Sequence, residues 1–179
     1  MTNILLINPA EEKVTKKIKK IDFPSLALQA VAGSFPEHVK FKIIDEQIDD
    51  FPSLDDYDLI GVTINMSCKA PHAYELATDL RKAGKKVILG GVHVSSLPDE
   101  AKKYADSIVV GEIENLGSQI IYDLESGNLQ KRYSSLYPDI NLSRPKRDFF
   151  SKNDWRKRYY APNLIETSRG CPNDCTFCS

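Results

Sequence analysis

Five short apolar segments, each followed by a turn and then by a more polar stretch, constrain the fold of this 179-residue chain more than any other feature. Their apolar residues run almost without interruption instead of alternating, which is typical of strands covered on both faces of a parallel sheet. The pattern predicts an α/β domain, a doubly wound, mostly parallel five-stranded sheet of Rossmann-like or flavodoxin-like type. The predicted strands are residues 3–8, 41–45, 59–64, 86–91 and 107–112.

The stretches between these strands predict helices. The clearest is 71–83, where apolar residues recur every three or four positions, Pro71 suits the first turn and Gly84 suits the C-terminal cap. A second helix is expected at 25–35 with Ser25 as its N-cap. The two others are expected at 97–105 and 114–126.

The alternation of strand and helix predicts a domain over residues 1–127, and the loss of this pattern predicts a linker over 128–162 that separates the domain from residues 163–179. The linker contains three prolines and a group of large aromatic residues but no sustained period, so we expect it to lie over another surface. Residues 163–168 return to the character of a strand.

Composition excludes several classes of protein. The formal net charge of -1 offers no general attraction for nucleic acid, although residues 13–20 are locally basic and read as a solvated loop or helix face. No apolar run approaches the roughly 20 residues of a membrane span, and the N-terminus does not resemble a secretory signal. We therefore expect a cytoplasmic protein with no membrane span and no nucleic-acid partner.

Polar residues and glycines follow three of the predicted strands, where open α/β sheets bind their ligands. Adjacent glycines permit close approach of a bulky ligand, but taken alone they are more typical of a tight turn. The histidine is either a ligand contact or satisfied by backbone, and the glutamates either contact a ligand or favour a helix N-terminus. The candidate binding residues are Thr63, Asn65, Ser67, Gly90, Gly91, His93, Ser95, Gly111, Glu112 and Glu114.

Cys171, Cys175 and Cys178 lie within the last nine residues and are separated by three and two positions. Four cysteines at these spacings favour a metal site over a disulfide framework. A zinc site completed by Cys68 and a redox pair are the alternatives to an iron-sulfur cluster.

Three motifs together resemble the family of radical S-adenosylmethionine (SAM) enzymes with a cobalamin-binding domain. They are GGVHVSSLPDEAKKYADSIVVGEIE at 90–114, PKRDFF at 145–150 and SRGCPNDCTFCS at 168–179. The resemblance implies a cobalamin-binding domain followed by the first strand of a truncated β/α barrel. It also implies that Cys171, Cys175 and Cys178 hold a 4Fe-4S cluster whose fourth iron binds SAM, since three thiolates leave one iron open.

In the resembled family, the SAM bound to the cluster is cleaved to a 5'-deoxyadenosyl radical and a second SAM methylates cobalamin. The resemblance therefore implies a parent enzyme that transfers a methyl group from methylcobalamin to an unactivated carbon, or else catalyses a cyclisation or rearrangement. Its partners would be a small-molecule or peptide substrate and an external electron donor. The DxHxxG motif of many other cobalamin proteins is absent, so the lower ligand of cobalt stays open.

A barrel of this kind needs about 200 residues, so we expect this chain to be the N-terminal part of a longer enzyme. By itself it should bind cobalamin without catalysing the radical reaction. A non-catalytic module that senses cobalamin or another ligand is the main alternative. A flavodoxin-like electron carrier is disfavoured because Asn8-Pro9-Ala10 stands where a hydroxyl-rich phosphate loop would be.

Overall fold

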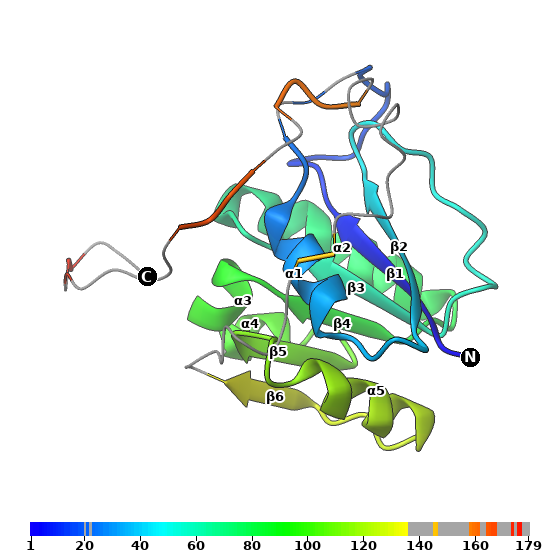
Figure 1. Cartoon of the computed structure of the whole chain (residues 1–179). Coiled ribbons are helices and arrows are strands. Elements are labelled where there is room, and N and C mark those ends of the chain that lie inside the picture. The colour runs from blue at the N-terminus through cyan, green and yellow to red at the C-terminus, as the bar shows by residue number, and fades with distance from the viewer. Residues whose placement is uncertain are drawn as a thin grey trace.

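The computed structural model describes residues 1–19, 21, 23–135, 145–146, 158–161, 164–167, 173 and 175–176. These residues form a six-stranded parallel sheet with the strand order β2-β1-β3-β4-β5-β6 (Figure 1). The order reverses at β1, because β2 lies on one side of it and all later strands lie on the other. The doubly wound parallel α/β fold is therefore confirmed. The strands are β1 (Asn3–Asn8), β2 (Lys40–Asp45), β3 (Leu59–Thr63), β4 (Val87–Gly90), β5 (Ser107–Gly111) and β6 (Arg132–Ser135).

Helices cover both faces of the sheet, as the continuous apolar strands require. Helices α1 (Leu26–Ser34) and α5 (Gly117–Glu125) pack with one face, where the core includes Ile4, Leu6 and Ile88. The opposite core contains Leu5, Ile7 and Leu89 and is covered by α2 (Ala70–Lys82), α3 (Val92–Ser96) and α4 (Pro98–Ala101). A short 3₁₀ turn, η1 (Ser67–Lys69), leads into α2. Neighbouring strand residues thus point to opposite cores.

The sheet has one strand more than the five that the sequence predicts. Strand β6 pairs in parallel with β5 and lies inside the segment assigned to the linker. Its sequence, RYSS, is short and polar, and only Tyr133 is buried. An edge strand with one buried side chain gives almost no hydrophobic pattern, which explains why it was missed.

Other predicted elements differ in extent. Helices form close to 25–35 and 71–83, with the Ser25 hydroxyl accepting a hydrogen bond from the Leu28 amide and Gly84 at a φ of 80°. The helix expected at 97–105 is only the four-residue α4, and α3 occupies a stretch expected to be a loop. Residues 164–167 form no strand.

The loops after β3 and β4 are held together at Gly91. Its φ is 108°, and a Cβ added there would lie 2.7 Å from the carbonyl oxygen of Ile64. The Ile64 amide donates to the Gly90 carbonyl at 2.7 Å, and the His93 amide donates to the Ile64 carbonyl at 3.0 Å. Gly91 is therefore required by the protein's own backbone. The sequence left open whether this glycine serves a ligand or a turn, and the backbone contact alone is enough to require it.

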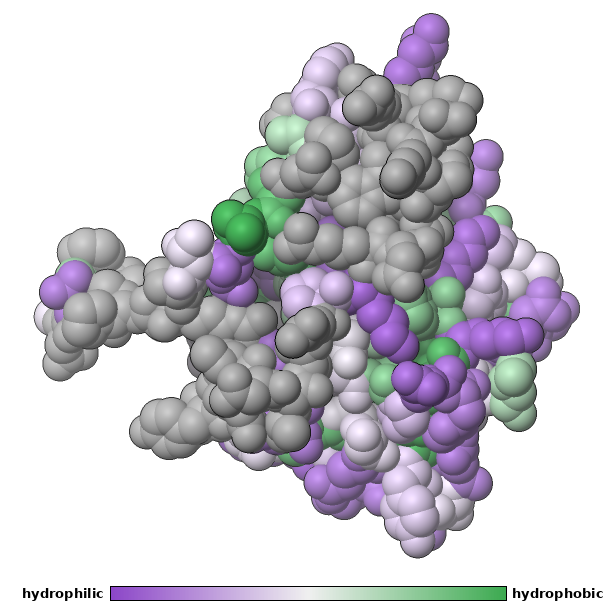
Figure 2. Space-filling view, in the orientation of Figure 1, coloured by the Kyte–Doolittle hydropathy of each residue, from purple (hydrophilic) through white to green (hydrophobic). Residues whose placement is uncertain are grey.

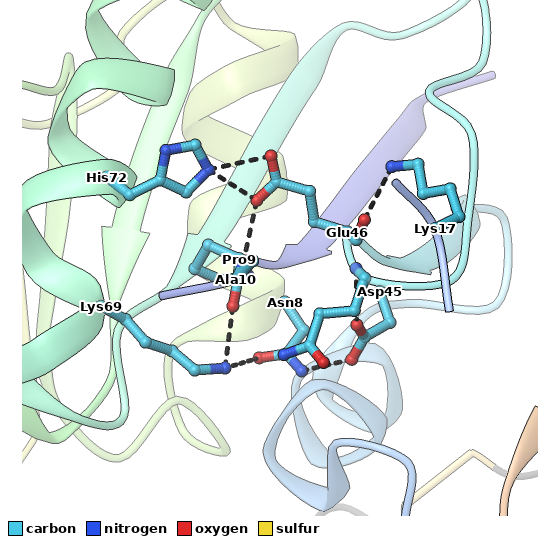
Figure 3. Close-up of polar contacts among 9 residues, drawn as sticks. Asn8, Pro9, Ala10, Lys17, Asp45, Glu46, Lys69 and His72 are labelled. Atoms are coloured by element: carbon cyan, nitrogen blue, oxygen red, sulfur yellow. Dashed lines mark hydrogen bonds and ion pairs between the residues drawn. The ribbon is translucent and has the colours of Figure 1, made fainter. Parts of the chain in front are cut away.

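A buried polar network fixes the loops after β1 and β2 (Figure 3). The carboxylate of Glu46 accepts from His72 at 2.8 Å and from the Ala10 amide at 3.0 Å. The Lys69 ammonium donates to the Pro9 carbonyl at 2.8 Å and to the side-chain oxygen of Asn8 at 3.3 Å. Because these groups are removed from water, each depends on its partner, and together they hold the chain after β1 against the start of α2.

Asp45 belongs to the same network. It is buried, and burial raises the pKa of its carboxyl group, while the hydrogen bond from Asn8 acts in the opposite direction. The Arg158 guanidinium pairs with neighbouring Asp49, so a residue from the predicted linker is tied to this end of the sheet.

The view of Figure 2 shows the hydropathy of one face of the molecule. In Figure 2 the coloured part of this face is mostly hydrophilic, and hydrophobic residues occur in small groups. Among the helices of the described residues, none combines the length and apolar character that a membrane span requires.

Replacing Gly91 by alanine should destabilise the fold more than replacing Gly84. Both glycines have positive φ, which costs an alanine about 1–2 kcal/mol. Only Gly91 also faces a backbone oxygen, since nothing lies within 4 Å of a Cβ added at Gly84. Urea denaturation should show a free energy of unfolding lower by about 1 kcal/mol or more for Gly91→Ala than for Gly84→Ala. Equal losses would contradict the close contact.

Breaking the Glu46–His72 pair from one side should be costly, because it leaves a buried carboxylate without its partner. We expect His72→Leu to lower the free energy of unfolding by about 3 kcal/mol. The double variant Glu46→Gln, His72→Leu should recover part of that loss in the same denaturation assay. His38→Leu removes the exposed ion pair with Glu125 and serves as the control, with little expected change. Additive losses in the double variant would show that the two side chains are not coupled.

Candidate functional site

A cavity of about 840 Å³ lies on the face of the sheet that α1 and α5 cover. It extends from Ile4 and Leu59, near the amino ends of β1 and β3, to Gly90 and Gly111 at the carboxyl ends of β4 and β5. The cavity thus runs along the sheet and reaches the edge where open α/β sheets bind ligands. Its volume lies within the range of small-molecule and cofactor sites.

Most of the residues predicted from the sequence line this cavity. They come from the ends of three neighbouring strands, so the parallel topology brings them together although they are far apart in the chain. Those that line it are Thr63, Asn65, Gly90, Gly91, Ser95, Gly111, Glu112 and Glu114.

Hydrogen bonds fix the mouth of the cavity. Thr63 is buried, and its hydroxyl donates to the side-chain oxygen of Asn65 at 3.0 Å. The Ser95 hydroxyl donates to the Gly91 carbonyl at 3.1 Å and accepts from the Gly111 amide at 2.9 Å. Ser95 therefore joins the end of β5 to the loop after β4, and the backbone around the mouth is set before any ligand arrives.

Gly90 lines the cavity and has no side chain to fill it. Its φ is not in the left-handed region, and an added Cβ would meet Val109 at an ordinary van der Waals distance of 3.7 Å. The fold does not need glycine here, in contrast to Gly91. Both glycines line the cavity, but only Gly91 is needed for the backbone conformation.

The body of the cavity was not predicted. It is apolar and is formed by alternate residues of the strands together with residues of α1 and α5. Gly61 is the informative member, because it lies in a central strand where an added Cβ would come within 2.8 Å of a Leu6 methyl group. A glycine inside a strand is a signal of close approach that the sequence did contain. The lining of the body includes Leu6, Ala30, Val31, Phe35, Gly61, Ile88 and Val109.

Ser67 and His93 are not among the described residues that line the cavity. His93 is buried on the other side of the sheet edge, with its Nδ1 3.1 Å from the Ser67 hydroxyl and its ring 6.1 Å from the ring of Tyr74. Burial raises the pKa of Tyr74, and the nearby Glu100 raises it further. The structure thus brings these two predicted residues together, but away from the other eight.

The three clustered cysteines are only partly described. Cys171 and Cys178 lie outside the described residues, and Cys175 is exposed with a free thiol. Within the described part of the chain, no group of three or more His, Cys, Asp or Glu side chains is placed to hold a metal ion. Glu166, five residues before Cys171, lines the cavity.

Similarity to known proteins extends over most of the chain. A Chlorobaculum tepidum protein, bacteriochlorophyllide d C-8(2)-methyltransferase, is 36% identical over 159 residues, which is 86% of this chain and 35% of that protein. The bacteriochlorophyllide d C-12(1)-methyltransferase of the same organism is 31% identical over 125 residues, which is 69% of this chain and 27% of that protein. An uncharacterized methyltransferase of Pyrococcus horikoshii is 26% identical over 206 residues, which is 98% of this chain and 45% of that protein.

The match covers about a third of the length of one Chlorobaculum relative and about a quarter of the other. No solved structure gives a significant match. The B12 binding domain family matches residues 19–121, a range that contains the strands β2 to β5 and all ten predicted binding residues. With its parallel doubly wound sheet and its cavity at the carboxyl edge, the chain belongs to the B12-binding domain family.

Proposed function

We propose that this chain is the cobalamin-binding part of a cobalamin-dependent radical SAM methyltransferase. The observation that carries the proposal is the cavity that begins at the carboxyl ends of β3, β4 and β5 and continues along the sheet beneath α1, in a chain of the B12-binding family. Cobalamin has two parts, a corrin ring that carries amide groups and a nucleotide tail. The polar mouth and the apolar body of the cavity suit these two parts.

The corrin ring would meet the polar residues at the mouth. Asn65 and Ser95 provide neutral hydrogen-bond groups, and the carboxylates of Glu112 and Glu114 are acceptors for amide N–H groups. Gly90 adds no side chain at this point. The tail would enter the apolar body, where burial of its aromatic base against residues such as Val109 and Phe35 would favour binding.

The loop after β1 does not offer a histidine to cobalt. It carries Asn8-Pro9-Ala10, and each of these residues is already engaged with Lys69, Asp45 or Glu46 in the buried network (Figure 3). Residues 9–24 contain no histidine, so this loop cannot supply one as the lower ligand, in agreement with the absence of the DxHxxG motif. When bound, cobalamin supplies a cobalt centre that carries a methyl group from one donor to another acceptor.

The cysteine spacing supports the radical SAM part of the proposal, and the names of the relatives support methyl transfer. Cys171, Cys175 and Cys178 provide three thiolates for a 4Fe-4S cluster and leave one iron for SAM. The two Chlorobaculum relatives are named as methyltransferases acting at C-8(2) and C-12(1) of bacteriochlorophyllide d. We infer that the parent enzyme of this chain also methylates a carbon atom, with an external electron donor reducing its cluster.

A leucine at Gly90 should block the cavity without unfolding the protein, because the position tolerates a Cβ. We expect Gly90→Leu to weaken hydroxocobalamin binding about 10- to 100-fold, measured by spectrophotometric titration of the 179-residue chain. Ser118→Leu, an exposed substitution on α5 outside the cavity lining, is the control and should bind like the wild type. A folded Gly90→Leu variant with wild-type affinity would remove the cavity from the cobalamin site.

Anaerobic reconstitution with iron and sulfide tests the cluster. The wild-type chain should acquire the visible absorption of a 4Fe-4S cluster and, after reduction, its electron paramagnetic resonance signal. Cys175→Ala should lose both signals, because two thiolates do not hold the cluster. Cys68→Ala is the matched control and should keep them. If Cys68→Ala also failed, or if zinc bound in place of iron with Cys68 as a ligand, the cluster assignment would be wrong.

A further inference from the structure

His93 is the one predicted binding residue that is buried and yet turned away from the cavity. It is 7% exposed, and it lies in α3 directly after the Gly90-Gly91 pair. Its ring packs near Tyr74, which itself stacks on Tyr104 with 4.2 Å between the ring centroids. The two ring nitrogens of His93 have different surroundings, and this difference suggests what the residue does.

The Nδ1 atom of His93 lies 3.1 Å from the hydroxyl oxygen of Ser67. Ser67 begins η1, and its side chain is exposed at the carboxyl edge two residues after Asn65. This side-chain bond runs alongside two backbone bonds between Ile64 and the loop after β4. Of these three hydrogen bonds, only the one between His93 and Ser67 reaches beyond Asn65 to the outer part of the loop. It therefore fixes the direction of the Ser67 side chain.

The Nε2 atom of His93 is buried and makes no hydrogen bond to any residue the structure describes, but it lies 3.6 Å from a carboxylate oxygen of Glu100. A carboxylate at this position favours the tautomer with the proton on Nε2. Nδ1 is then an acceptor, and the Ser67 hydroxyl donates its proton to His93. The lone pairs of the Ser67 oxygen are consequently left for groups outside, such as the N–H of an amide.

We propose that His93 is a positioning residue for cobalamin binding that acts through Ser67. It does not touch the corrin ring but holds the Ser67 hydroxyl as an acceptor for one amide group of the ring. The proposal rests on the proposed function, because it assumes that cobalamin lies over the carboxyl edge. It assigns to the histidine of the GGVH segment a role distinct from that of the eight cavity residues.

The test separates the two nitrogens by substitution. An asparagine side chain places an amide near the position of Nδ1, whereas glutamine places one near Nε2. We expect His93→Asn to bind hydroxocobalamin within about twofold of the wild type, and His93→Gln and Ser67→Ala each to weaken binding about 3- to 10-fold. The double variant His93→Gln, Ser67→Ala should be no weaker than either single variant, since both remove the same contact.

Matched controls make the outcome specific. His38→Asn changes a histidine outside the cavity lining that pairs with Glu125, and it should leave the affinity unchanged. Ser67 is exposed, so Ser67→Ala retains the fold even if a His93 variant does not. If Ser67→Ala binds like the wild type, or if His93→Asn is as weak as His93→Gln, His93 serves packing alone and the proposal is overturned. A wild-type chain that retains no cobalamin would instead overturn the proposed function and this inference with it.

Discussion

The contact between Gly91 and the carbonyl of Ile64 is the constraint on which the rest of the site depends. Parallel strands end at one edge of the sheet, but their loops form a binding surface only if they lie close together. Here the loop after β4 passes so near to β3 that a Cβ would lie 2.7 Å from a backbone oxygen. That approach brings Gly90 and Asn65 to the same cavity mouth and places His93 beside Ser67.

The carboxyl edge of the sheet has two different parts, a buried polar network at β1 and β2 and an open cavity mouth at β3, β4 and β5. Around β1 and β2, buried ionic and polar groups join the loops to α2. The Asn8 side chain, the Pro9 carbonyl and the Ala10 amide all make hydrogen bonds within the protein. Around β3, β4 and β5, glycines and short polar side chains leave an open mouth above an apolar cavity. Rigidity on the first side gives the second side a fixed frame, since binding then costs little ordering of the loops.

The sequence predicted the sheet and the mouth of the cavity because both follow from local patterns. Buried strands are continuous apolar runs, and residues after parallel strands converge whatever their separation in the chain. Strand β6 was missed because one buried residue, Tyr133, creates no pattern. The apolar body was missed because core residues such as Val109 and Phe35 look the same whether they face a helix or a cavity. The sequence names His93 as a candidate binding residue, but no local pattern reveals which side of the sheet edge its side chain faces.

Hydrogen exchange of the 179-residue chain, with and without hydroxocobalamin, tests the central claim that the ligand occupies the cavity beneath α1. Bound cobalamin should slow exchange of the amides in α1 and in residues 90–92, 95–96 and 111–114, which border the cavity, and should leave α2 on the opposite face nearly unchanged. Protection confined to α2, or no protection of α1 at saturating cobalamin, would contradict the assignment.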